Sequence, residues 1–90
     1  MMEVTVRLFA TYREAVGSAE LRWKIDEGAS VGDLWRELQA AYPRMPQVKP
    51  AAAINAEYAR LDEKLQAGDE VAFLPPVSGG LAGKIGVAGL

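Results

Sequence analysis

The chain has 90 residues, 50% of them hydrophobic, and a formal charge of −2. That length suits one domain, because a core of ordinary size is built from about 100 residues. The sequence contains no histidine and no cysteine, which removes the commonest general base, the commonest metal ligand and every thiol nucleophile. A hydrolytic triad, a metal site and a disulfide framework are therefore not expected.

The distribution of charge and hydropathy limits the class of partner. Acidic and basic side chains are intermixed along the chain, so there is no basic stripe of the kind that binds nucleic acid. No apolar run approaches the roughly 20 residues that span a bilayer. The start, Met1-Met2-Glu3, is unlike a secretory signal. We expect a cytoplasmic protein that binds neither nucleic acid nor membrane.

The first half of the chain predicts two strands and two helical segments. Val4, Val6 and Leu8 alternate with polar residues, as in a half-buried strand. Ser30 is a good N-cap for a helix, and Asp33 stands where a capping-box acid belongs. The expected elements are a strand at 3–9, a short helical turn at 10–16, an antiparallel strand at 21–25 and an amphipathic helix from 31 to about 42.

The second half predicts shorter elements. Residues 51–56 read as a central strand of small residues, followed by a brief segment around Tyr58 and a helical or 3₁₀ turn at 61–65. Residues 70–74 form the last strand, with Val71 and Phe73 facing the core. One long helix across one face of a mixed sheet satisfies the layer rule for an α+β domain. With the last strand beside the first, this order fits the β-grasp arrangement.

The residues after the last strand are suited to entering a narrow active site. Pro75 and Pro76 stiffen the chain as it leaves the strand, and Gly79-Gly80 offers backbone without side chains. Such an arm lets another protein's catalytic centre approach its carbonyl groups closely. The alternative is a linker of low complexity.

A second feature is a set of apolar residues that face away from the core. Strand alternation turns Phe9 and Leu74 outward, and Tyr58 lies within reach of both if the first and last strands are neighbours. A patch of this kind marks a protein–protein interface, although single apolar residues on a surface need no explanation. The patch leads directly into the arm, which favours the interface.

Other side chains are assigned to structure rather than to chemistry. Trp23 and Trp35 fall at apolar positions and are expected in the core, whereas Tyr12 and Tyr42 are expected to be partly exposed. No pair of carboxylates converges, and the acidic side chains expected to be solvated are Glu14, Glu20, Glu27, Asp33 and Glu37.

Three stretches of the sequence resemble molybdopterin synthase small subunits, which are ubiquitin-like sulfur carriers. They are Val-Arg-Leu-Phe-Ala-Thr-Tyr-Arg-Glu at 6–14, Ala-Ile-Asn at 53–55, and Gly-Asp-Glu-Val-Ala-Phe-Leu-Pro-Pro-Val-Ser-Gly-Gly at 68–80. The resemblance covers residues 3–80, and the closing motif is long and specific.

The resemblance implies a β-grasp fold and a sulfur-carrying C-terminus. An activating enzyme would use ATP to adenylate the Gly80 carboxylate, and a sulfur donor would convert it into a thiocarboxylate. The large synthase subunit would then pass this sulfur to a pterin precursor. No cofactor would bind to the small subunit directly. By the same resemblance Gly79 belongs with Gly80 to the inserted terminus, and the residues that contact partners are Phe9, Tyr58, Leu74, Pro75, Pro76, Val77 and Ser78.

The chain departs from that family in one respect, because it continues for ten residues beyond Gly80. While the Gly80–Leu81 bond is intact there is no carboxylate to adenylate. The sequence therefore suggests a carrier domain at 1–80 and an extension at 81–90 that a processing peptidase removes.

Three other functions remain open. The carrier could serve another pathway, such as thiamin, tRNA thiolation or cysteine synthesis. It could be attached to lysines as ubiquitin is. It could also be an unprocessed β-grasp module whose apolar extension binds a partner.

Overall fold

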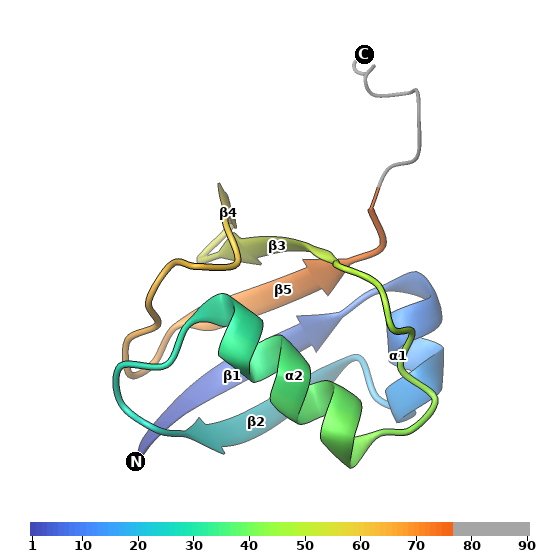
Figure 1. Cartoon of the computed structure of the whole chain (residues 1–90), viewed down its shortest axis with the longest axis horizontal. Coiled ribbons are helices and arrows are strands. Elements are labelled where there is room, and N and C mark those ends of the chain that lie inside the picture. The colour runs from blue at the N-terminus through green and yellow to red at the C-terminus, as the bar shows by residue number, and fades with distance from the viewer. Residues whose placement is uncertain (77–90) are drawn as a thin grey trace.

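A computed structural model describes residues 1–76, which form a mixed sheet of five strands covered by a helix (Figure 1). The long helix α2 lies across one face of the sheet, and the short helix α1 lies at the end of β1 (Figure 1). In chain order the elements are β1 (Met2–Leu8), α1 (Ala10–Val16), β2 (Glu20–Ile25), α2 (Val31–Ala41), β3 (Ala51–Ile54), β4 (Glu57–Ala59) and β5 (Glu70–Leu74).

The strand order is β2-β1-β5-β3-β4. β1 pairs antiparallel with β2 and parallel with β5, while β3 is antiparallel to both β5 and β4. The first and last strands are therefore neighbours at the centre of the sheet. The α+β class and the mixed sheet expected from the sequence are confirmed.

The core lies between the sheet and α2. Val6 and Val71 are directly opposite each other on β1 and β5, and both are fully buried. Val31, Leu34 and Leu38 line the inner side of α2 and are also fully buried. Burying an aliphatic side chain of this size stabilises a fold by about 1.5–3 kcal/mol. Among the described residues 1–76, every core residue and every strand lies between residues 2 and 74, so a chain of residues 1–80 keeps this core and can fold by itself.

Three aromatic rings fill one end of the core. Trp35 on α2 packs between Tyr12 and Phe73, with ring centroids 4.9 Å apart on each side. Its indole N–H donates to the carbonyl oxygen of Val48 at 3.1 Å. Tyr12 is only 1% exposed, so the expectation that it is partly exposed was wrong. The helix α1 directs Tyr12 into the core, where its ring packs against Trp35 of α2. This contact depends on tertiary packing, which the local sequence pattern does not reveal.

The start of α2 is fixed by a complete capping box. The Asp33 backbone N–H donates to the Ser30 hydroxyl at 3.1 Å, and the Asp33 carboxylate accepts from the Ser30 N–H at 2.9 Å. These bonds, with the Arg36 guanidinium beside it, lower the pKa of the Asp33 carboxyl. The capping role that the sequence indicated for Ser30 and Asp33 is confirmed. The helix has 11 residues, and no helix in the described part of the chain is long and apolar enough to cross a membrane.

The segment expected to make a single helical or 3₁₀ turn at 61–65 has that form only at its start. It forms a hydrogen-bonded turn from Arg60 to Glu63 and then an extended bridge to Ser30. The cause is the start of α2, because its first N–H groups need acceptors. The Val31 and Gly32 N–H groups donate to the carbonyl oxygens of Glu63 and Leu61 at 2.9 and 2.8 Å, which holds this segment open.

The ends of β1 and β3 also differ from those expected. β1 ends at Leu8, and Phe9 becomes the N-cap of α1. β3 ends at Ile54, because Asn55 and Ala56 turn the chain into β4.

The Tyr12 hydroxyl gives a test of the core. It is buried without a hydrogen-bond partner among residues 1–76, and burial raises the pKa of this phenol. We expect Tyr12→Phe to raise the free energy of unfolding by about 1 kcal/mol, because it removes an unsatisfied polar group. Urea denaturation would measure the change. Tyr42→Phe, at a half-buried position, is the control and should be neutral to within about 0.5 kcal/mol. A loss of stability in Tyr12→Phe would show that the hydroxyl has a partner.

Candidate docking face

The sheet face opposite α2 carries a row of residues aligned by strand register. Arg7 on β1 is opposite Ala72 on β5, Ala72 is opposite Ala53 on β3, and Ala53 is opposite Tyr58 on β4. Arg7 and Ala72 alternate with buried neighbours of their own strands. Because residues directly opposite each other on neighbouring strands share one face of a sheet, all four belong to the open face. The Tyr58 side chain is largely free, since the residue is 87% exposed.

Two shallow depressions lie side by side on this face. The larger has a volume of about 270 Å³ and the smaller about 210 Å³. Alanines form the floor, and larger side chains form the walls. The larger depression is lined by Phe9, Ala53, Ala56, Tyr58, Ala72 and Leu74. The smaller one shares Phe9, Ala56 and Ala72 and adds Arg7 and Glu70. We call this surface the docking face. The structure thus brings together Phe9, Tyr58 and Leu74.

A strained hairpin presents Tyr58. Asn55 and Ala56 have φ angles of +51° and +73°, the left-handed values of a type I′ turn, in which glycine is favoured at the second position. A left-handed alanine costs about 1 kcal/mol. The Ala56 methyl group nevertheless belongs to both depressions.

The side chain of Asn55 ties this hairpin to the last strand. Its Oδ1 accepts from the Glu70 N–H at 2.9 Å, and its Nδ2 donates to Asp69 Oδ1 at 3.1 Å. The Asn55 backbone N–H also donates to the Glu70 carbonyl at 2.7 Å. These three bonds hold Tyr58 in a fixed position relative to β5.

The rim of the docking face carries one ion pair. Arg7 Nη1 lies 3.2 Å from Glu70 Oε2, and both side chains are nearly half exposed. Water screens such a pair, so it adds at most about 1 kcal/mol to stability. Its exposed charges are better suited to orienting a partner than to holding the fold together.

Phe9 sits where β1 meets α1. Its backbone is still extended, but the next residue, Ala10, has a φ of +54°. This change of direction starts α1 immediately after the strand. Phe9 is left 40% exposed, although its neighbour Leu8 is buried.

The chain leaves the sheet at the docking face. β5 ends at Leu74, which lines the larger depression, and Pro75 and Pro76 follow immediately. The predicted site residues Val77, Ser78, Gly79 and Gly80 lie outside the described residues, as does the extension at 81–90. The division into a carrier domain and an extension stays a prediction.

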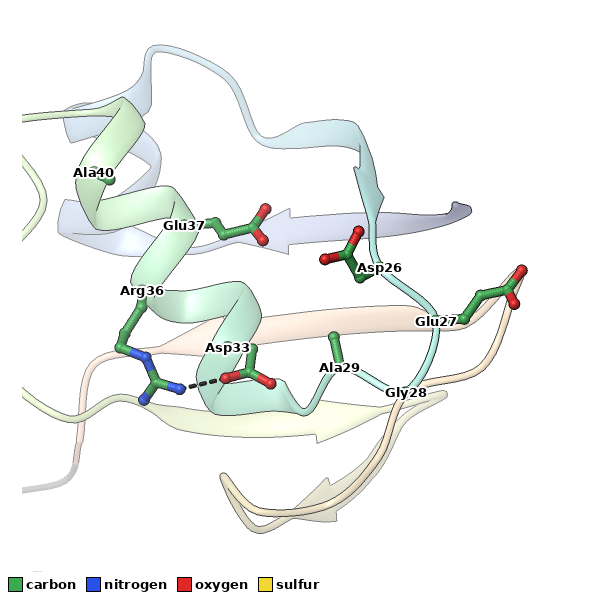
Figure 2. A pocket seen from close by; sticks show the side chains of 8 residues that line it. All are labelled: Asp26, Glu27, Gly28, Ala29, Asp33, Arg36, Glu37 and Ala40. Carbon is green, nitrogen blue, oxygen red and sulfur yellow. Dashed lines mark hydrogen bonds and ion pairs between the residues drawn. The ribbon is translucent and has the colours of Figure 1, made fainter.

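A larger depression of about 540 Å³ lies beside the start of α2, on the other side of the sheet. Figure 2 shows carboxylates lining it, with Arg36 bonded to Asp33. Glu37 was expected only to face solvent, but its carboxylate accepts a hydrogen bond from Trp23 Nε1 at 2.9 Å. Asp33, Arg36 and Glu37 therefore serve the fold. Among residues 1–76, no cluster of three or more carboxylate side chains could hold a metal ion.

Sequence reasoning missed the alanine floor and the ion pair. Ala72 could have been found, because it alternates with Val71 and Phe73 and so shares the face of Leu74. Ala56 and the Arg7–Glu70 pair could not have been found. The position of Ala56 depends on the type of hairpin turn. The ion pair depends on the register between β1 and β5, because Arg7 and Glu70 are 63 residues apart in the sequence.

The sequence signature of the ThiS family matches residues 6–80. The chain belongs to the ThiS family. The matched part of this ThiS-family protein contains the whole docking face and ends at Gly80.

Relatives of this ThiS-family chain have two kinds of name. Small archaeal modifier protein 3 of Haloferax volcanii is 38% identical over 92 residues, covering 88% of this chain and 100% of the relative. The molybdopterin synthase sulfur carrier subunit of Chlamydomonas reinhardtii is 40% identical over 83 residues, covering 88% and 100%. The resemblance to molybdopterin synthase small subunits is confirmed.

Solved structures confirm the β-grasp fold. The putative molybdopterin converting factor subunit 1 of Pyrococcus furiosus superposes with a TM-score of 0.77 and 30% identity, covering 86% of this chain and 100% of that one. Subunit 1 in a complex with subunit 2 of the molybdopterin-converting factor of Helicobacter pylori gives a TM-score of 0.59 and 26% identity, covering 88% and 100%.

The strained turn gives a test of the docking face. We expect Ala56→Gly to raise the free energy of unfolding by about 1 kcal/mol, because glycine adopts a positive φ without steric cost. Thermal denaturation would measure it. The control is Ala53→Gly, in β3 at an ordinary φ, which should lower stability by about 0.5–1 kcal/mol. Equal losses in both variants would contradict the assignment of strain to Ala56.

Proposed function

We propose that this chain is a sulfur carrier that donates sulfur for molybdopterin synthesis from Gly80, after the Gly80–Leu81 bond has been cut. The observation that carries the proposal is the position of the arm. Pro75 and Pro76 follow a strand end that itself lines the docking face. A partner bound to Phe9, Tyr58 and Leu74 therefore receives the chain that leads to Gly80.

Cleavage and activation proceed in a fixed order. A peptidase adds water across the Gly80–Leu81 bond and frees the Gly80 carboxylate. In the activating enzyme this carboxylate attacks the α-phosphorus of ATP and displaces pyrophosphate. The product is an acyl-adenylate, a mixed anhydride with a good leaving group. Hydrosulfide from the sulfur donor then attacks the carbonyl carbon and displaces AMP, and loss of a proton leaves the carrier with a terminal thiocarboxylate.

The carrier supplies docking and a terminus, and its partners supply catalysis. The sequence has no histidine or cysteine, and among residues 1–76 the only ionisable groups that line the docking face are Tyr58 and the Arg7–Glu70 pair. In the proposed synthase the large subunit holds the docking face and draws Gly79 and Gly80 into its active site. Sulfur passes to the pterin precursor, and water restores the Gly80 carboxylate. The Helicobacter pylori relative in complex with its subunit 2 supports a partner of this kind.

A second function is favoured by the relative named small archaeal modifier protein 3. The acyl-adenylate is a shared intermediate, since a lysine amine and a sulfur nucleophile can both attack an activated carbonyl. As a modifier, Gly80 would end in an isopeptide bond to a target lysine. The docking face serves the activating enzyme in both cases.

The test uses chains of residues 1–80 and 1–90 with the activating enzyme, ATP and a sulfur source. Intact mass should show an oxygen-to-sulfur exchange in the 1–80 chain and no change in the 1–90 chain, which has no Gly80 carboxylate. The same exchange in the uncut chain, or none in either chain, would contradict the proposal.

The docking residues are tested in the 1–80 chain. We expect Tyr58→Ala to weaken binding to the large subunit by at least about tenfold, as loss of an exposed aromatic anchor does. Isothermal titration calorimetry would measure the Kd. Lys24→Ala, an exposed position on β2, is the matched control and should bind normally. Unchanged binding in Tyr58→Ala would place the interface elsewhere.

A further inference from the structure

One edge of the sheet is open among residues 1–76. β2 is the outermost strand on the side away from β4, and Figure 1 shows it at the border of the sheet. A strand at such an edge presents backbone N–H and C=O groups that can pair with another extended chain. The docking face contains no residue of β2, so an inference drawn from this edge does not rest on the proposed function.

The hydrogen bonds of β1 show which backbone groups of β2 are open. The Thr5 N–H donates to the Asp69 carbonyl oxygen at 2.9 Å, so Thr5 bonds toward β5 and not toward β2. Arg22 is opposite Thr5 in the antiparallel register, and it therefore directs its N–H and C=O groups away from β1. Lys24, two residues further along β2, does the same. None of these four groups has a hydrogen-bond partner within the described part of the chain.

The beginning of the same edge is already closed. Glu20 also directs its backbone groups outward, but the Ser18 hydroxyl accepts from the Glu20 N–H at 3.3 Å and donates to the Glu20 carbonyl oxygen at 2.8 Å. The open part of the edge therefore runs from Leu21 to Ile25, which is long enough to pair with about five residues of another strand.

The side chains of this open edge have a different chemistry on each face of the sheet. Arg22 and Lys24 are exposed, and neither takes part in an ion pair among residues 1–76. Leu21 and Trp23 point to the other face, where both are partly buried against the core. The Trp23 ring also packs against Tyr42, with ring centroids 6.2 Å apart. An added strand would place alternate side chains beside two cations and beside this apolar strip.

Two carboxylates lie near these cations without neutralising the outer side of the edge. Glu3 is opposite Lys24, but it belongs to β1 and so lies on the inner side. Glu20 precedes Arg22 by two residues and stands at the end that Ser18 closes. The outer side of β2 at residues 22–24 therefore presents positive charge.

We propose that β2 binds an extended segment of another protein in which acidic and apolar side chains alternate. The segment adds a strand antiparallel to β2, because antiparallel pairing lets one partner residue exchange both backbone hydrogen bonds with Arg22 and a second do so with Lys24. These two partner residues are the acidic ones, since residues directly opposite each other share a face. The residue between them is apolar and lies beside Trp23.

The same charges exclude a second copy of this chain as the partner. The antiparallel register that pairs all the open groups of two copies sets Arg22 of each copy opposite Lys24 of the other. Two like-charge pairs would then face each other across the new ladder and destabilise it. Charges at this edge thus prevent self-association and select a strand of opposite charge.

The experiment titrates the isotope-labelled full chain with a synthetic peptide and follows its backbone amide NMR signals. The probe is acetyl-Gly-Val-Glu-Val-Glu-Val-Gly-amide. We expect shift changes to concentrate at residues 21–25 and Tyr42. The variant Arg22→Glu/Lys24→Glu should bind the probe at least about tenfold more weakly, because two attractive cross-strand pairs become repulsive. Tyr58→Ala, on the docking face, is the matched control and should bind the probe as the unaltered chain does.

Altered probes separate strand pairing from simple charge attraction, and they are tested on the unaltered chain. N-methylation of both glutamates removes the N–H groups that face β2 and should weaken binding at least about tenfold. N-methylation of the central valine, whose N–H points away from β2, should change the Kd by less than about twofold. A probe with lysine in place of both glutamates should not bind.

Four results would each overturn the proposal. They are equal affinity of the two N-methylated probes, equal affinity of the glutamate and lysine probes, shift changes centred on the docking face, and no binding at millimolar probe. None of them bears on the proposed function, because thiocarboxylate formation by the 1–80 chain is measured separately.

Discussion

The parallel pairing of β1 with β5 is the constraint on which the rest of the structure depends. It places Leu8 opposite Phe73, so that Phe9 and Leu74, one residue further along each strand, meet at the same end of the sheet. If β1 and β5 were antiparallel, the C-terminal ends of the two strands would lie at opposite ends of the sheet. The docking face would then lose one wall, and the proline arm would leave the sheet far from it. Parallel pairing requires a crossover, and the long connection that contains α2 supplies it.

Strand alternation then separates stability from recognition. On β5, Val71 and Phe73 face the core while Ala72 and Leu74 face outward, so every second residue is free to suit a partner without cost to packing. The strained turn at Ala56 adds to this division, because its methyl group helps to form the depressions although glycine would be more stable there. Stability given up at such a position is typical of a surface shaped for binding.

The fold could largely be predicted from the sequence, because periodicity was strong where the chain is regular. Val4, Val6 and Leu8 marked β1, and Ser30 with Asp33 marked the start of α2. Prediction fell short where tertiary contacts decide. The residues at 61–65 are held open by the N–H groups of α2, and Tyr12 is buried by contact with Trp35. The outward residues of the site followed from alternation. The alanine floor required the register of β3, β4 and β5, which local sequence does not contain.

The central claim is that a processed terminus at Gly80 carries sulfur, and intact mass spectrometry of the protein from its native cell tests it most directly. The account predicts a species that ends at Gly80 and carries an oxygen-to-sulfur mass change while molybdopterin is being made. Recovery of only the chain through Leu90 under those conditions would contradict it. The β-grasp domain would then be an interaction module whose extension is retained.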